Sequence, residues 1–330
     1  MKLPLYKVDA FTTIPFRGNP AAVCLLEAPL ADDTMKAIAR EMNLSETAFV
    51  MPVAGTGTRK SASAGGDQSG GDHPGDNYAG SHYSLRWFTP QVEVPLCGHA
   101  TLSTAKVLFD EVGVAAGELR FETRSGLLKA VRVGDGIKLD FPLDAPVQVA
   151  APPGIIQALG NPKVLNCAYG RATKKLLVQL EDQDKVVKLA PDFSALKLAK
   201  SDVEIHGLIV TAAAGQADTS RRADAAGQAV GAEQAGAERQ TNAGRQGKAY
   251  DFISRYFAVW IGIDEDPVTG SSHTVLAPYW GKILGKSRMR AYQASSRGGE
   301  MEVILPENSD GNRVGLVGQA VVVEKGHLYF

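Results

Sequence analysis

The chain has 330 residues, of which 44% are hydrophobic and 22% are charged, and its 35 basic side chains nearly balance 36 acidic ones. This composition is typical of a globular protein long enough for about two domains. A net charge of -1 provides no basic surface for nucleic acid or for an anionic membrane, so we expect a small molecule or another protein as the partner.

Cysteine content and hydropathy indicate the compartment. Cys24, Cys97 and Cys167 are too few and too scattered for a disulfide framework or a zinc site, so no metal centre is expected. The chain starts directly with a strand-like segment and shows no signal peptide, and no apolar run is long enough to span a bilayer. The sequence therefore predicts a protein of the reducing cytoplasm.

The N-terminal part alternates between strand and helix patterns. Gly-Asn-Pro at 18–20 is a turn signature, and Asp32 or Asp33 can cap a helix. The predicted elements are strands at 5–11, 21–26, 44–50 and 85–90 and a helix that ends near Asn43, with Glu46 inside the third strand.

Two stretches have little to bury and are predicted to be insertions. Residues 55–83 are crowded with Gly, Ser and Asp, and residues 212–248 are rich in Ala, Gly, Gln, Arg and Glu. The second stretch has no apolar face that would hold a helix against a core. A solvated insertion is therefore favoured over a Gln-rich interaction segment.

A glycine between two proton-handling side chains stands before a predicted helix. Cys97, Gly98 and His99 follow an apolar run, and residues 100–109 have the small-residue pattern of a helix. The N–H groups of a helix start can bind an anion, and Cys and His exchange protons near neutral pH. By itself, however, this pattern is more often one of packing residues than of catalysts.

The rest of the chain is predicted to contain many short strands and few helices. The strands are 118–123, 126–133, 136–141, 164–169, 175–180, 205–210, 288–293, 300–305, 313–317 and 320–324, and the helices are 151–159, 192–198 and 273–284.

The last of these helices begins like the helix after Cys97. Residues 269–271 (Thr-Gly-Ser) align with residues 97–99 (Cys-Gly-His), and each triplet follows a strand and an acidic turn. Helices that are apolar nearly all round are buried. We therefore predict an α+β fold of two similar domains, each a mostly antiparallel β-roll or barrel around a central helix. Both helix N-termini would face one cleft and could share a carboxylate ligand.

Six motifs occur in a fixed order along the chain. They are Phe-Arg-Gly-Asn-Pro-Ala-Ala-Val at 16–23, Asn-Leu-Ser-Glu-Thr-Ala-Phe at 43–49, Arg-Trp-Phe-Thr-Pro at 86–90, Cys-Gly-His-Ala-Thr at 97–101, Asp-Pro-Val-Thr-Gly-Ser at 266–271 and Ser-Arg-Gly-Gly at 296–299. Together they resemble the phenazine-biosynthesis-like (PhzF-like) isomerase family of the diaminopimelate-epimerase-like fold superfamily. The resemblance covers nearly the whole chain outside the two insertions.

The resemblance implies two pseudo-symmetric domains with the active site between them, no cofactor, and a homodimer. The N-terminal domain would comprise residues 1–126 and 317–330, and the C-terminal domain residues 127–316. Glu46 matches the family's proton-transferring carboxylate, His99 its Gly-His histidine, and Asp266 the aspartate of its Asp-Pro-x-Thr-Gly-Ser motif. The implied substrate-binding positions are Asn19, Gly98, Gly270 and Ser271.

These residue types suit the movement of a proton from one carbon to another. A carboxylate whose pKa is raised by an apolar setting can take a proton and return it elsewhere, and Glu46 stands between Leu44, Ala48 and Phe49. The alternative for Glu46 is a solvated strand-edge residue, and for Asp266 an N-cap or turn residue. The predicted function is a cofactor-independent isomerase of a small carboxylate-bearing metabolite.

Two other functions are considered. Two-base racemases and epimerases of the superfamily place a cysteine on each side of the substrate carbon, but here Thr269 stands opposite Cys97. A threonine hydroxyl is too weakly acidic to replace a thiolate, which disfavours this class. A non-catalytic binding or scaffold protein would use the insertions as surfaces, but it has no need for all three proton-handling residues.

Overall fold

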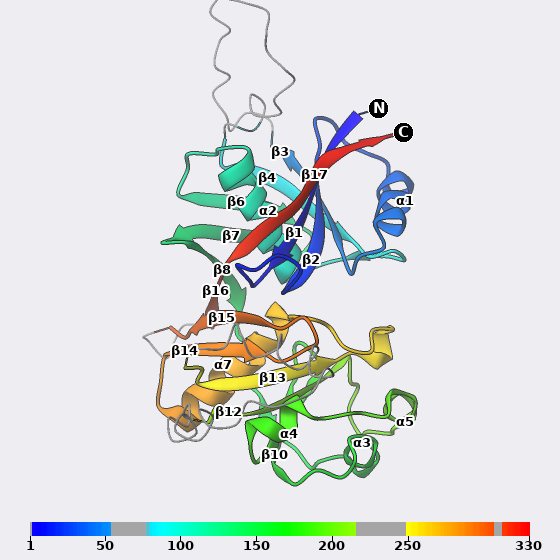
Figure 1. Ribbon diagram of the computed structural model, residues 1–330, viewed down its shortest axis with the longest axis vertical. Coiled ribbons are helices and arrows are strands. Elements are labelled where there is room, and N and C mark those ends of the chain that lie inside the picture. The colour runs from blue at the N-terminus through cyan, green and yellow to red at the C-terminus, as the bar shows by residue number, and fades with distance from the viewer. Residues whose placement is uncertain (1, 54–77, 79, 216–248, 307–311) are drawn as a thin grey trace, which may run out of the picture.

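The computed structural model describes residues 2–53, 78, 80–215, 249–306 and 312–330. The chain forms an upper and a lower half in Figure 1, which meet at a waist where strand β8 (Gly136–Pro142) pairs with β16 (Arg313–Gly318). The two termini lie side by side at the top, because β1 (Lys2–Ala10) pairs along its length with β17 (Ala320–Tyr329).

Strands make up most of both halves. The remaining strands of the upper half are β2 (Asn19–Leu25), β3 (Thr47–Pro52), β4 (His82–Phe88), β5 (Glu93–Val94), β6 (Glu118–Thr123) and β7 (Gly126–Val133). Those of the lower half are β9 (Val147–Gln148), β10 (Val164–Gly170), β11 (Lys175–Leu180), β12 (Gly207–Ala213), β13 (Phe252–Phe257), β14 (Arg288–Gln293) and β15 (Gly299–Ile304).

The two halves repeat one order of strand pairings. In the upper half the path β17–β1–β2–β3–β4–β6–β7–β8 is antiparallel except at β2–β3 and β4–β6. In the lower half the path β9–β10–β11–β12–β13–β14–β15–β16 is antiparallel except at β11–β12 and β13–β14. The parallel pairs fall at equivalent steps, which confirms the predicted pseudo-symmetric α+β fold.

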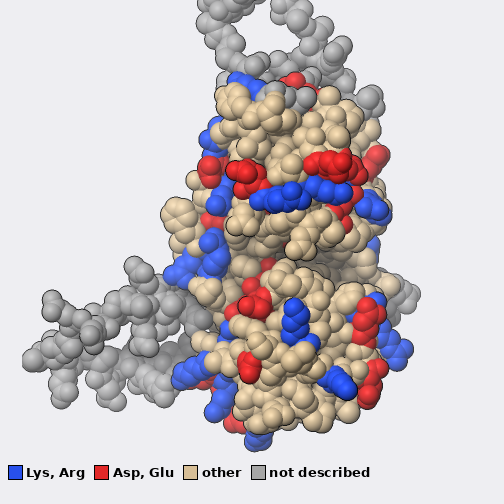
Figure 2. Space-filling view, turned by 90° about the vertical axis from the view of Figure 1, so that its right-hand side faces the viewer, with Lys and Arg blue, Asp and Glu red and all other residues tan. Residues whose placement is uncertain are grey.

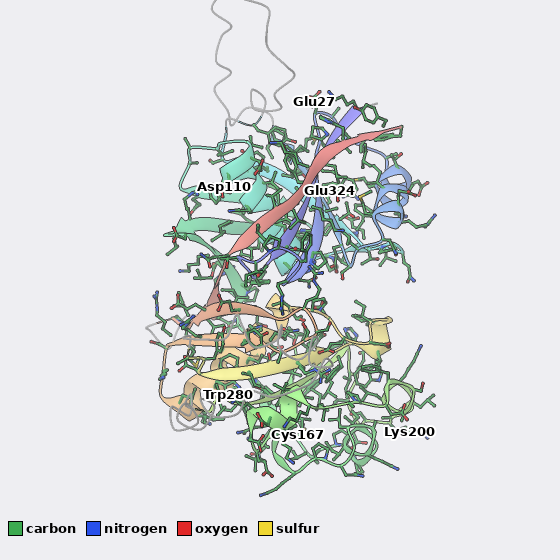
Figure 3. The ribbon with its side chains drawn as sticks, in the orientation of Figure 1. Glu27, Asp110, Cys167, Lys200, Trp280 and Glu324 are labelled. Carbon is green, nitrogen blue, oxygen red and sulfur yellow. The ribbon has the colours of Figure 1, made fainter. Side chains whose placement is uncertain are left out.

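Each half encloses one helix, as predicted. Helix α2 (Gly98–Lys106), continued by the π-helical turn η2 (Val107–Glu111), packs against β1, β2, β3 and β8, and helix α7 (Gly270–Leu284) packs against β14, β15 and β16. Seven of the nine residues of α2 and nine of the fifteen residues of α7 are buried. Figure 3 labels Asp110 in the upper half and Trp280 in the lower half, so the two helices run away from each other from starts near the waist.

The other helices cover the outside of the sheets. Helix α1 (Asp32–Met42) packs on β3 and β4 over a separate small core, and the short helices α3 (Pro153–Ala158), α4 (Gln183–Val187) and α5 (Phe193–Leu198) contribute to a core of the lower half. A 3-10 turn, η4 (Val259–Ile261), follows β13. The short elements α4, β5 and β9 were not predicted, because so few residues carry no periodic pattern. Strand β13 was not predicted as a strand either.

Several predicted boundaries were wrong. Helix α2 begins at Gly98 and α7 at Gly270, before the predicted starts at Ala100 and His273, because each glycine follows an extended N-cap residue and is itself helical. Strand β3 begins at Thr47, so Glu46 precedes the strand instead of lying inside it.

The predicted insertions both extend too far. Strand β4 begins at His82 and β12 continues to Ala213, so residues 82–83 and 212–213 belong to the sheet. Tyr78 is also buried, and its hydroxyl donates to the carbonyls of Leu26 and Val50. Most of both insertions lies outside the described residues. The predicted domain boundaries fall inside β7 and β16, where the pairing continues, and the division at those residues stays a prediction.

The surface carries both signs of charge. Figure 2 shows Lys and Arg side chains interspersed with Asp and Glu over the face that it presents. Within the described part of the chain, no helix is long and apolar enough to cross a membrane.

Candidate active site

The N-termini of α2 and α7 meet at the waist. Cys97 and Thr269, the N-cap residues, are both extended, and neither side chain makes a capping hydrogen bond. A Cβ placed on Gly98 would lie 3.6 Å from the Gly270 Cα, so the two helix starts approach closely. Uncapped helix N-termini direct N–H groups and positive dipole ends outward, and two of them in one place make an anion-binding arrangement.

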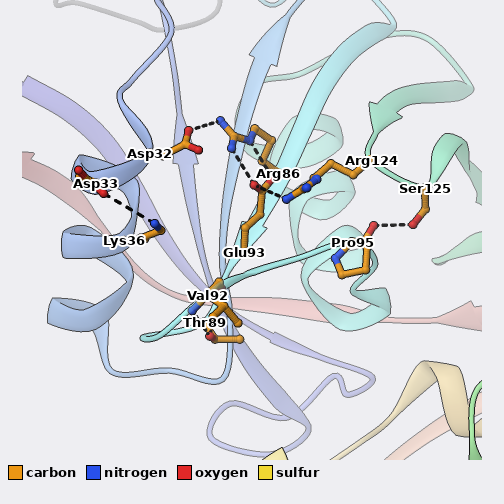
Figure 4. A network of polar contacts seen from close by, with 10 residues as sticks. All are labelled: Asp32, Asp33, Lys36, Arg86, Thr89, Val92, Glu93, Pro95, Arg124 and Ser125. Carbon is orange, nitrogen blue, oxygen red and sulfur yellow. Dashed lines mark hydrogen bonds and ion pairs between the residues drawn. The ribbon is translucent and has the colours of Figure 1, made fainter.

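The segment that leads into α2 is anchored by charged side chains. Arg86 on β4 donates to both carboxylate oxygens of Glu93 at 2.8 Å, and Arg124 also donates to Glu93 (Figure 4). Ser125 donates to the Pro95 carbonyl at 2.7 Å (Figure 4). These contacts fix the backbone just before Cys97 from the outside of the half, so that the start of α2 has a defined position.

Glu46, Cys97 and His99 form a cluster beside the start of α2. The His99 Nε2 atom lies 3.3 Å from the Glu46 Oε2 atom, and the Cys97 Sγ atom lies 3.5 Å from the His99 Nδ1 atom. Neither Glu46 Oε2 nor His99 Nε2 has an aligned hydrogen-bond partner among the described residues, although both are buried. Both atoms are therefore available to form hydrogen bonds with a substrate.

Burial determines the protonation states of this cluster. Burial, helped by the negative charge of Asp266 and opposed by a hydrogen bond with Cys97, raises the pKa of Glu46 to about 8. Burial lowers the pKa of His99 to about 4 and raises the pKa of the Cys97 thiol well above its usual range. Near pH 7 His99 is thus a neutral imidazole, Cys97 a thiol, and Glu46 a carboxyl group that exchanges its proton readily.

Asp266 stands on the other side of the waist, just before α7. The Asn19 Nδ2 atom donates to its Oδ1 at 2.9 Å, and the Thr269 hydroxyl donates to its Oδ2. Burial raises the pKa of Asp266 to about 6, while the hydrogen bonds from Thr269 and Asn19 and the positive charge of Lys175 act in the opposite direction. Its carboxylate is ionised near pH 7 and lies close enough to Glu46 to influence it.

Sequence reasoning missed two residues that shape the α7 side. The Gln293 side chain accepts from the Thr269 N–H and donates to the Asp266 carbonyl, both at 2.8 Å, which fixes the turn before the helix. The buried Lys175 ammonium donates to the Ser271 hydroxyl at 3.0 Å. A lone Lys or Gln at a strand end carries no sequence signal for a site, although the strand that begins at Lys175 was itself predicted.

The motif at 296–299 holds Asn19 in place from across the waist. The Arg297 guanidinium donates to the Gly18 carbonyl and to the buried Asp9 carboxylate, both at 2.8 Å. Gly18 has a φ of +65°, and a Cβ there would lie only 2.1 Å from the Ala10 carbonyl oxygen, so only glycine fits. The turn that carries Asn19 is thereby locked to the lower half.

The structure brings all the predicted site residues to the waist: Glu46, Gly98 and His99 on the α2 side, and Asn19, Asp266, Gly270 and Ser271 on the α7 side. Glu46, Cys97 and His99 place possible metal-ligand atoms within 4.8 Å of one another. However, Cys97 faces one imidazole nitrogen and Glu46 faces the other. An ion bound to one imidazole nitrogen would face only Glu46 or only Cys97, so the three side chains are poorly arranged to hold a single ion.

Comparisons with known proteins bear on the family and the fold of the chain. The profile of the family described as phenazine biosynthesis-like protein matches residues 8–326. A phenazine biosynthesis-like domain-containing protein of Rattus norvegicus is 42% identical, covering 99% of both chains. A Pseudomonas aeruginosa protein named an uncharacterized isomerase is 40% identical over the whole of both chains. The crystal structure of a PhzF-family phenazine biosynthesis protein from Enterococcus faecalis covers both chains fully, with a TM-score of 0.77 and 36% identity.

Proposed function

The chain belongs to the phenazine biosynthesis-like family, and from this premise we propose that it is an isomerase that moves a proton between two carbons of a small carboxylate-bearing metabolite. The name of the Pseudomonas aeruginosa relative supports an isomerase. In this proposal the reaction uses side chains of the protein as acid and base and needs no cofactor.

The observation that carries the proposal is the state of Glu46. A carboxyl group with a pKa of about 8 is matched to proton transfer near neutral pH, because it gives and takes a proton at similar free energy. It lies beside a neutral imidazole and next to two uncapped helix N-termini. An exposed strand-edge glutamate would have none of these features.

The reaction can be written with these groups alone. The substrate carboxylate binds at the N-termini of α2 and α7, which places the neighbouring carbons near Glu46. The Glu46 carboxylate takes a proton from one carbon, and the electron pair of that C–H bond moves into the unsaturated system of the substrate. The Glu46 carboxylic acid then returns the proton to a second carbon, so that substrate and product are isomers and the protein is unchanged.

His99 and Asp266 have supporting roles in this scheme. The neutral His99 imidazole can donate a hydrogen bond to the substrate where negative charge develops. Asp266 raises the pKa of Glu46 through its charge and holds Asn19 and Thr269 around the substrate. The substrate contacts proposed for Gly98, Gly270 and Ser271 follow from their place in the first turns of the two helices.

A two-thiol epimerase is a weaker candidate. The Thr269 hydroxyl, opposite Cys97, donates its hydrogen bond to Asp266 and has no thiolate chemistry to offer. The scaffold alternative depends on the insertions, which lie largely outside the described residues. A homodimer and a cytoplasmic location stay predictions, and sedimentation at several concentrations would test the first.

The test is hydrogen exchange at carbon. The protein is incubated in deuterated water with a panel of small unsaturated or cyclic carboxylates, and exchange is followed by NMR. We expect deuterium at carbon with the wild type and with Glu41→Gln, a control on an exposed position of α1. Glu46→Gln should abolish it, and exchange that persists unchanged in Glu46→Gln would rule out the mechanism.

A further inference from the structure

Lys175 is a buried ammonium group at the α7 side of the waist. The residue is 7% exposed, and its Nζ atom donates to the Ser271 hydroxyl at 3.0 Å and lies 5.5 Å from the centre of the Tyr256 ring. Among the described residues it forms no ion pair within 4.0 Å. An ammonium group has three donors, so a hydroxyl and an aromatic ring leave it poorly compensated for the loss of water.

The nearby carboxylates do not compensate the Lys175 ammonium group for its loss of water. The carboxylate of Asp144 accepts from the Thr173 N–H, the Thr173 hydroxyl and the Ala172 N–H. Asp266 is engaged with Asn19 and Thr269. Burial lowers the pKa of Lys175 to about 8, although the charges of Asp144 and Asp266 act to raise it. Lys175 is therefore largely charged near pH 7, and no carboxylate of the described residues pairs with its ammonium group.

The structure around Lys175 is shaped to hold it toward the site. Lys175 pairs with Gly207 between β11 and β12, and a Cβ on Gly207 would lie 2.0 Å from the Tyr256 hydroxyl oxygen. Only glycine leaves space for the Tyr256 ring to cross the strand beside Lys175. The Tyr256 carbonyl in turn accepts from the Asp266 N–H at 3.1 Å. Lys175, Tyr256 and the Asp266 turn are therefore one packed unit.

We propose that Lys175 and Ser271 form an anion subsite at the first turn of α7, which binds the substrate carboxylate and makes negative charge a requirement for binding. The inference rests on the proposed function, because it assumes that the waist is the substrate site. The charges around the waist give the reason. Asp266 and, once ionised, Glu46 repel an anion, and helix N-termini alone contribute only partial charges. Lys175 supplies the full positive charge that offsets them.

The test uses a matched pair of probes, crotonate and its neutral amide, crotonamide. Their dissociation constants are measured by NMR titration at pH 7 for the wild type, Lys175→Met, Lys175→Gln, Ser271→Ala and Lys174→Gln. Lys174 is the control, because it lies next in the chain but pairs with Glu204 at the exposed side. Thermal unfolding establishes that each variant is folded.

We expect the wild type and Lys174→Gln to bind crotonate more tightly than crotonamide. Lys175→Met and Lys175→Gln should weaken crotonate binding about 10- to 100-fold, as expected for loss of a charged hydrogen bond, and leave crotonamide binding unchanged. Ser271→Ala should weaken crotonate binding less, and it provides the answer if the Lys175 variants do not fold.

Equal weakening of crotonate and crotonamide binding in the Lys175 variants would show that Lys175 only supports the fold. Unchanged crotonate binding would also overturn the proposal. The two proposals can fail separately. Carbon exchange that depends on Glu46, together with an anion preference that is independent of Lys175, would leave the isomerase standing and remove the subsite. An anion preference that depends on Lys175, without Glu46-dependent exchange, would keep the anion subsite and remove the isomerase mechanism.

Discussion

The starts of α2 and α7 have the same backbone and different chemistry. Each follows an extended N-cap residue, begins with a glycine and enters a helix enclosed by one half of the protein. Around α2 lie the ionisable side chains Glu46, Cys97 and His99, and among these three Glu46 has a pKa of about 8, close to neutral. Around α7 lie groups held by hydrogen bonds: the Lys175 ammonium donates to the Ser271 hydroxyl, and the Gln293 side chain accepts from the Thr269 N–H.

This difference indicates a division of labour between two copies of one structural unit. The parallel pair β2–β3 begins beside Glu46, and its equivalent β11–β12 begins at Lys175. The repeated parallel pair thus serves both helix starts from different strands, because Glu46 precedes β3, whereas Lys175 opens β11, the equivalent of β2. We propose that the α2 side moves the proton and the α7 side binds and orients the substrate.

The largest effect is expected from Glu46→Gln. Loss of the Glu46 carboxyl group, which moves the proton in this scheme, should lower kcat by about 10³-fold or more with little change in KM, because the substrate-binding groups remain. Steady-state kinetics on a substrate found by the exchange assay would measure this. A large rise in KM at normal kcat would instead assign Glu46 to the binding side and break the comparison.

Asp266→Asn should have a smaller effect and a distinctive pH signature. Removal of the negative charge weakens the orientation of Asn19 and Thr269, and kcat should fall roughly 10²-fold. It also lowers the pKa of Glu46, because Asp266 acts to raise it. The rising limb of the rate with pH, which reports ionisation of Glu46 near pH 8 in the wild type, should move to lower pH. A limb that does not move would mean that another group controls it.

The raised pKa of Glu46 also has a consequence for stability. Its folded-state pKa of about 8 exceeds its usual 4.5, so the stability that the protonated carboxyl contributes is fully present below pH 4.5 and is lost as the pH rises to 8. Glu46→Gln cannot ionise and should be more stable than the wild type at pH 8, by about 4 kcal/mol, and equally stable at pH 4. Urea unfolding at both pH values would measure this, and a Gln variant that is less stable at pH 8 would contradict the burial of an ionisable Glu46.

The smallest effect is expected from Cys97→Ala. Its thiol has a raised pKa and lacks an equivalent thiol across the waist, so activity should fall by less than about five-fold. The same kinetic assay measures it, with Glu46→Gln as the inactive reference. If Cys97→Ala were as inactive as Glu46→Gln, side chains at both helix starts would have to take part in proton transfer, and the epimerase interpretation would return.

Much of this site was accessible from local sequence patterns. The echo between residues 97–99 and 269–271 predicted two buried helices with facing starts, and both are observed. The position of Glu46 was less accurate, because Asn43 ends α1 in a left-handed conformation with a φ of +50° and the chain needs residues 44–46 to enter β3. The strand pattern of a sequence does not indicate at which residue the preceding helix ends.

The sequence by itself determined the elements, the repeat and the residue types of the site, since these depend on periodicity and on motifs of a few residues. Only the tertiary structure decided which groups share the waist and in which protonation state. Glu46 and Asp266 are 220 residues apart (266 − 46), and the pKa of each depends on burial and on charges that the folding of both halves brings together. Lys175 carries no motif, and its importance comes from burial beside Ser271 without a carboxylate partner among the described residues.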